Sequence, residues 1–175
     1  MIIRFLGLAL CLGCCTAPLI AQDVDGWDFL QANSLRGIDN LVVQVYLSNE
    51  NPSDLGLTRE TLLEYMEMRL RQSRVGVLSF DEAVETGRTV FLRLEVLALL
   101  VGDRGWVHRL DLQVLQEACI RASPPDDPLH GCLLVGTWSN GTLNVGSSTL
   151  LMESIREQLT GLMDGFLNDY VLVNP

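Results

Sequence analysis

The chain has 175 residues, a formal net charge of −10 and 12 basic residues, every one of which is an arginine. Such acidity argues against nucleic acid and against anionic membrane surfaces as partners, because both require patches of lysine and arginine. The absence of lysine excludes Schiff-base chemistry and a phosphate-binding loop lysine. Arginine-only usage also favours a bacterial source.

Residues 1–21 are typical of a secretory signal peptide. Arg4 supplies the positive charge, the run from Phe5 to Cys15 is apolar and too short to span a bilayer, and Ala21 is the small residue before a cleavage site. Two alternatives stay open: lipid attachment at Cys14 or Cys15, and an uncleaved anchor. We therefore expect an exported protein, periplasmic or extracellular, whose contact with a membrane is limited to such a lipid anchor.

Residues 22–37 form an acidic arm that we expect to pack loosely, and residues 38–175 are expected to form a single α+β domain. In the first strand, residues 38–47, apolar and polar side chains alternate, which indicates a sheet with one solvent-exposed face. Thr58 caps a helix that reaches about Arg74, and a short strand follows over 76–80.

Two long strands are predicted over 90–101 and 106–121, joined by a tight turn at 102–105. A further strand over 132–138 follows a proline-rich loop. Asn140-Gly141 predicts a type I′ turn into a short return strand over 142–145. An apolar stripe from Leu151 to Phe166 predicts the last helix. The order is β-α-β-β-β-β-α: a two-layer sandwich with a parallel first crossover, a mixed sheet and two helices on one face.

Cys119 and Cys132 are the two cysteines that remain after the signal. An even pair in an exported protein predicts a disulfide, here between two neighbouring strands. Free thiols are one alternative. A metal site is another, with His130 two residues before Cys132 and His108 as a fourth candidate ligand.

No residue pattern predicts catalysis, so we expect a non-enzymatic protein without cofactor or metal. His108 and His130 are interpreted as solvated loop or edge residues, and Gly136, Gly141 and Gly146 as turn glycines. Trp106 and Trp138 stand beside predicted turns at the ends of the sheet. Aromatic residues are enriched at protein interfaces, so both are candidates for an interaction surface, the alternative being packing over the rim of the core.

Several segments together carry a family resemblance: the strand around Leu41, the Gly56-Leu57-Thr58 helix start, the Leu70-Arg71 helix end, the long hairpin, and the final helix with Phe166-Leu167-Asn168-Asp169-Tyr170. This pattern resembles uncharacterised exported bacterial proteins. More distantly it resembles small periplasmic domains such as the lipopolysaccharide-assembly lipoproteins and the N-terminal domain of the Tol-Pal propeller protein. The resemblance implies docking onto partners without an active site.

The sequence therefore favours a binding or adaptor domain that docks on a protein complex of the cell envelope, through strand edges or the open sheet face. A small-ligand carrier with a pocket between sheet and helices is the first alternative, and an enzyme of unknown class is the second. The identity of the partner and the oligomeric state stay open.

Overall fold

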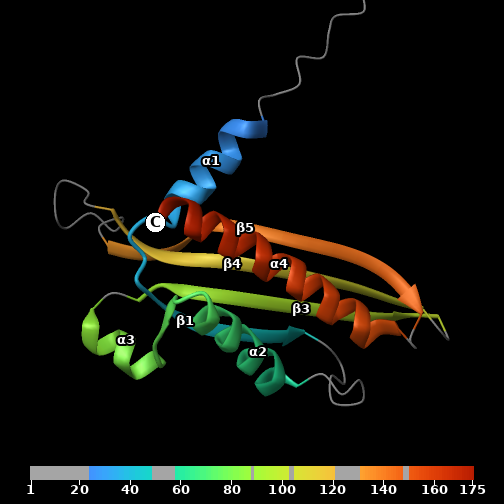
Figure 1. Cartoon of the computed structure of the whole chain (residues 1–175). Helices are drawn as coiled ribbons and strands as arrows, with labels where there is room; N and C mark the ends of the chain where they lie inside the picture. Colours follow the sequence, from blue (N-terminus) through green and yellow to red (C-terminus); the bar gives the residue numbers. More distant parts are fainter. Residues whose placement is uncertain (1–23, 49–57, 88, 103–104, 121–130, 148–149) are drawn as a thin grey trace, which may run out of the picture.

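The computed structural model describes residues 24–48, 58–87, 89–102, 105–120, 131–147 and 150–175 (Figure 1). The predicted signal, the predicted loop at 123–130 and His130 lie outside these residues. The elements are α1 (Val24–Ser34), β1 (Asn40–Ser48), α2 (Arg59–Gln72), β2 (Gly76–Val77), α3 (Phe80–Thr86), β3 (Phe91–Val101), β4 (Gly105–Ile120), β5 (Gly131–Ser147) and α4 (Leu151–Val173). Among them, no helix is long and apolar enough to cross a membrane.

The five strands form one mixed sheet in the order β2-β1-β3-β4-β5. β1 runs parallel to both β2 and β3, whereas β3, β4 and β5 pair antiparallel. The α+β class, the parallel first crossover and the antiparallel hairpins agree with the sequence prediction. The long strands are β3, β4 and β5, so this half of the sheet extends well beyond the short pairing of β1 with β2.

The main core lies between the sheet and helices α2 and α4, which cover the same face (Figure 1). Alternate residues of the strands point into it, among them Leu41 and Val45 of β1 and Leu94 of β3, because successive strand side chains face opposite ways. The apolar stripe of α4 covers these residues, with Ile155 and Phe166 fully buried. Amphipathic helices on an alternating sheet therefore account for this layer.

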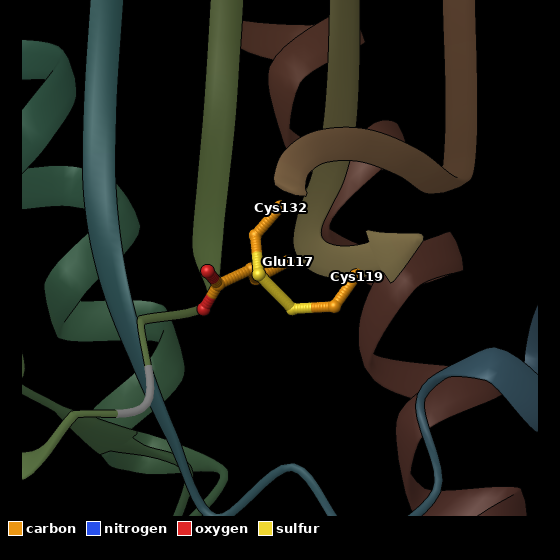
Figure 2. Close-up of side chains that lie close together, drawn as sticks. All are labelled: Glu117, Cys119 and Cys132. Carbon is orange, nitrogen blue, oxygen red and sulfur yellow. A yellow bond between two sulfur atoms is a disulfide. The ribbon is translucent and has the colours of Figure 1, made fainter. Parts of the chain in front are cut away.

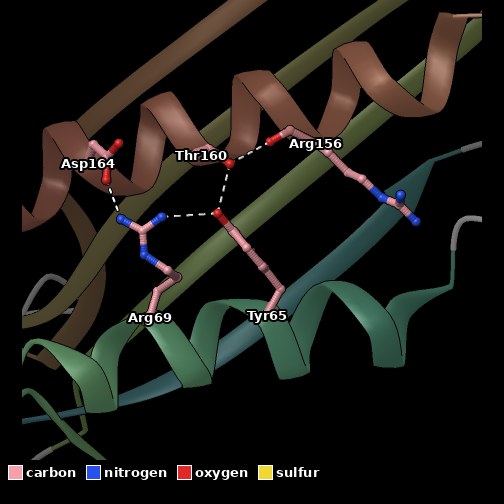
Figure 3. A network of polar contacts seen from close by, with 5 residues as sticks. All are labelled: Tyr65, Arg69, Arg156, Thr160 and Asp164. Atoms are coloured by element: carbon pink, nitrogen blue, oxygen red, sulfur yellow. Dashed lines mark hydrogen bonds and ion pairs between the residues drawn. The ribbon is translucent and has the colours of Figure 1, made fainter.

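A polar network joins α2 to α4 above the core (Figure 3). The hydroxyl of Tyr65 lies 2.7 Å from that of Thr160, and Arg69 donates to the Tyr65 oxygen at 3.1 Å. Arg69 also forms an ion pair with Asp164. This ion pair and the hydrogen bonds to Asp164 and Tyr65 raise the pKa of Arg69, against the opposing effect of burial. The network therefore links the two helices through polar side chains.

Helix α3 is absent from the sequence prediction. It has seven residues, too few for a hydrophobic period, but its caps are well formed. Ser79 and Glu82 make a reciprocal capping box. The backbone N–H and the hydroxyl of Ser79 both donate to the Glu82 carboxylate and lower the pKa of Glu82. Gly87 ends the helix in the left-handed conformation at φ 65°. The capping residues were therefore a readable signal for α3.

The arm at 22–37 contains a helix, α1, and its C-terminal part is packed rather than loose. Ala32 and Leu35 are buried, and the hydroxyl of Ser34 donates to the carbonyl of Thr137 in β5 at 2.9 Å. Asn174 binds the carbonyl of Leu35 at 3.0 Å. These contacts with β5 and the end of α4 come from residues far away in sequence, which is why local composition misses them.

The predicted turn at Asn140-Gly141 is wrong, since both residues lie inside the single strand β5. Gly141 pairs with Asp111 of β4. A Cβ at Gly141 would stand 2.5 Å from the Asp111 carboxylate and 3.2 Å from the Leu110 carbonyl. The glycine therefore makes room for a neighbouring side chain, and the predicted strands at 132–138 and 142–145 are one.

We predict that Tyr65→Phe lowers the free energy of unfolding by about 1 kcal/mol, because it removes a partly buried hydroxyl bonded to Thr160 and Arg69. Tyr46→Phe is the matched control, since Tyr46 is 49% exposed. Urea denaturation of both variants measures the difference. Equal stability of the two variants would show that the network contributes nothing.

Candidate functional site

The sheet face opposite α2 and α4 has three zones along the strands. At one end α3 covers a second, smaller core made of Val42, Phe91, Leu115 and Ala83. The middle is charged, with Arg93 and Glu95 on β3 and Arg109 and Asp111 on β4. The far end has no covering element among the residues that the structure describes. This face is therefore open over most of its length.

Charges in the middle zone are paired with one another. The Arg109 Nε lies 2.6 Å from Asp111, and an Arg93 nitrogen lies 3.8 Å from Glu95. The guanidinium of Arg93 also lies over the ring of Tyr46, 5.0 Å from its centroid. Pairing of this kind gives a hydrated band with nearly balanced charge, which separates the covered end from the far end.

The far end carries exposed apolar side chains, which we call the apolar end: Leu97, Leu99 and Val101 of β3, and Leu143 and Val145 of β5. Their exposed fractions run from 36% for Leu97 to 71% for Leu143. Val107 of β4 pairs with both Leu99 and Val145 and so joins the two strands. Arg109 lies between Leu97 and Leu143, so the apolar side chains of β3 and β5 are joined through Val107 and not along that row. Apolar side chains gathered on a protein surface mark interaction surfaces.

His108 is buried, not solvated as its place in the sequence suggested. It is 1% exposed and lies between β4 and α4, where its Nε2 is 2.9 Å from Gln158 Nε2 and 3.3 Å from the hydroxyl of Ser154. Thr142 donates to the Gln158 oxygen at 2.6 Å, which directs the Gln158 amide nitrogen towards His108. His108 Nε2 therefore accepts, and the neutral ring carries its proton on Nδ1.

Burial lowers the pKa of His108. We predict that the protein loses stability as the pH falls below the ordinary histidine pKa of about 6.5. The reason is that His108 then binds a proton more readily in the unfolded chain than in the folded chain. The stability is fully present above that pH and is lost down to the folded pKa. Two carboxylates, Glu153 and Glu157, line the pocket beside His108.

Unfolding free energies at closely spaced pH values between about 7 and 5 check this prediction against His108→Gln, which cannot titrate. The variant should show a shallower pH dependence than the native chain. Parallel curves for the two proteins would contradict the assignment of the pH effect to His108.

The predicted disulfide between Cys119 and Cys132 is present (Figure 2). It joins directly paired residues of β4 and β5, with a Cα–Cα distance of 4.0 Å. Glu117 is close enough to both sulfurs for the three residues to form a candidate metal-ligand set. Sulfurs bonded to each other are not thiolates, however, and His108 lies far along β4 from the pair. The arrangement therefore favours a structural link over a metal centre.

We predict that Cys119→Ser/Cys132→Ser lowers the free energy of unfolding by about 3 kcal/mol on the chain-entropy model, given the separation of 13 residues. Denaturation of the native chain with and without reductant is the companion measurement, and reduction should reproduce the effect of the substitutions. A double variant as stable as the oxidised chain would refute the prediction.

The tryptophans predicted as an interaction surface belong to the core side instead. Trp138 is 2% exposed, meets the ring of Phe166 edge-on and donates from Nε1 to Asp169 at 2.9 Å. Trp106 is partly buried against the main core. Both side chains point towards the helices, because alternate residues of a strand face opposite sides of the sheet. The pairing of the strands is needed to tell which of these residues face the helices. Trp138 therefore packs over the core, which was the alternative to an interaction surface.

No family model matches the chain, and no curated protein matches it. Among solved structures, a PelC dodecamer from Paraburkholderia phytofirmans is similar, with 15% sequence identity and a TM-score of 0.43. The alignment covers 77% of this chain and 90% of that chain. A likeness at this level supports no conclusion about the function of this chain.

Proposed function

We propose that this protein is an exported, non-enzymatic binding domain that docks on a protein of the cell envelope through the apolar end. The observation that carries the proposal is the uncovered patch of five leucine and valine side chains on β3 and β5. A side chain of this kind gains roughly 1.5–3 kcal/mol when it is fully buried, so a protein partner that covers the patch gains substantial binding energy.

The charged band beside the patch supports docking in a defined orientation. Arg109 and Asp111 are paired with each other, and Arg109 borders Leu143 and Leu97 through the strand register. Protein interfaces commonly have an apolar centre with a polar rim, and the band supplies such a rim along one side. The disulfide supports an oxidising compartment outside the cytoplasm, in line with the secretory signal expected at residues 1–21.

The two alternatives receive less support. A cleft between α2 and α4, lined by Leu62, Tyr65, Met152 and Leu159 among others, has a volume of about 130 Å³. Ligand pockets usually hold roughly 300–1,000 Å³. Two hollows of about 360 and 330 Å³ reach that size, but no residue of α2 or α4 is among their described lining residues, so neither is the expected pocket between the sheet and these helices. For enzymatic function, His108 is bonded to Ser154 and Gln158, and no carboxylate among the described residues orients it as a catalytic base.

We predict that Leu99→Asp/Val101→Asp reduces recovery of the envelope partner at least about tenfold, because the charges prevent the patch from being dehydrated. Native purification from the cell envelope with quantitative mass spectrometry identifies the partner, and direct binding of the two purified proteins confirms it. Val84→Asp/Leu172→Asp is the control, since it adds the same charge at residues 57% and 72% exposed outside the patch. Equal recovery with both variants would contradict docking at the apolar end.

A further inference from the structure

Strand β5 is one edge of the sheet and is far longer than the strand at the other edge. It has 17 residues, whereas β2 has two. The backbone of an edge strand offers a row of N–H and C=O groups to another strand. Of the two edges, β5 is the one long enough to accept such a strand over several residues.

Residues 131–147 contain no charged side chain and no proline, in a chain with 12 basic and 22 acidic residues. Soluble proteins usually block their edges with charge, proline, a bulge or a covering element. The first half of β5 has two such devices: a bulge opposite Val114 and Leu115, and α1, which contacts Thr137. The second half, 139–147, contains no bulge, charge or proline, and α1 reaches only its first residue, where Leu30 and Gln31 line a hollow with Ser139.

One backbone N–H group in this second half has a side-chain oxygen as its hydrogen-bond acceptor. The N–H of Val145 donates to the side-chain oxygen of Asn144 at 2.7 Å. It is therefore available to an added strand once Asn144 turns away.

The two sides of this edge differ in chemistry. On the helix side, Thr142 and Asn144 bond to Gln158 and Ser154 of α4. Glu153 and Glu157 line the pocket above Asn144, and no arginine among the described residues contributes to its lining. On the open side, Leu143 and Val145 are 71% and 70% exposed. The edge is thus acidic on one side and apolar on the other.

We propose that β5 accepts, at residues 139–147, an extended segment of the partner protein in which basic and apolar residues alternate. This inference rests on the proposed function and names the chemistry of the partner. The basic residues would lie beside Glu153 and Glu157, because alternate side chains of an added strand point to the helix side. The apolar residues would lie beside Leu143 and Val145 and extend the apolar end.

Charge distinguishes this occupant from a second copy of the chain. Pairing two β5 strands antiparallel about a two-fold axis would bring Glu153 and Glu157 of both copies together above the junction, with no basic residue in the described part of the pocket lining to offset them. Like charges in such positions oppose association. A basic partner strand meets attraction at the same place.

Three synthetic nonapeptides test the proposal with the purified protein: alternating lysine and valine, alternating glutamate and valine, and the lysine peptide with a central proline. NMR titration measures affinity, and amide hydrogen exchange locates the site. The lysine peptide should bind at least about tenfold more tightly than either of the others and should slow exchange of amides within residues 139–147. The proline peptide controls for non-specific attraction to an acidic protein.

A charge-matched pair of variants tests the acidic side of the edge. Glu153→Gln/Glu157→Gln should weaken binding of the lysine peptide about tenfold at low salt. Glu60→Gln/Glu64→Gln removes the same charge from exposed positions of α2 and should leave the affinity unchanged. An equal loss in both variants would reduce the effect to net charge and overturn the assignment to this edge.

Equal binding of the lysine and glutamate peptides, or protection that falls outside residues 139–147, would overturn the proposal. Concentration-dependent self-association that protects the same amides would overturn it in favour of a second copy. Failure of strand addition can be told apart from failure of the proposed function. If Leu99→Asp/Val101→Asp loses the envelope partner but the lysine peptide does not bind, the protein docks at the apolar end without adding a strand to β5.

Discussion

The central constraint in this structure is that one sheet buries most of one face and only a short stretch of the other. Helices α2 and α4 cover the first face, and Leu94, Leu112 and Ile155 are fully buried between the layers. In the part of the chain that the structure describes, the second face has one short helix, α3, over Val42, Phe91 and Leu115. Because β3, β4 and β5 extend far beyond α3, the open end and the free edge both follow from this unequal coverage (Figure 1).

The spacing of apolar residues along the chain predicts the strands and helices whose buried face depends on that spacing alone. The alternation in β1 and β3 and the apolar stripe of α4 indicated which residues are buried, and these are in the core. The turn predicted at Asn140-Gly141 is wrong, because a glycine at this place serves equally in a tight turn and in a strand beside a bulky side chain. The neighbour, Asp111, is distant in sequence, and only the register of β4 against β5 brings it to Gly141.

The candidate site was harder to predict, because exposure depends on which element covers which face. Trp138 and Leu143 lie on the same strand, and of the two only Trp138 is a candidate for an interface in the sequence. Strand parity sends Trp138 to the helix side, where Asp169 accepts its N–H, and Leu143 to the open side. His108 likewise becomes buried because Thr142, Ser154 and Gln158, all distant in sequence, provide polar partners. The disulfide was predictable because cysteine pairing needs only two residues and an oxidising compartment.

The absence of charge in β5 has a structural cost that its packing does not offset. Leu143 and Val145 gain little from the fold while exposed, and an unblocked edge promotes unwanted pairing between chains. A single charged residue at either position would reduce that hazard without disturbing the core, since neither side chain is part of it. Core packing therefore does not account for apolar residues at these two positions, whereas a partner that covers the edge and the apolar end together does. The disulfide and the bulge, which hold β5 in register on β4, would then present the edge to that partner in one fixed alignment.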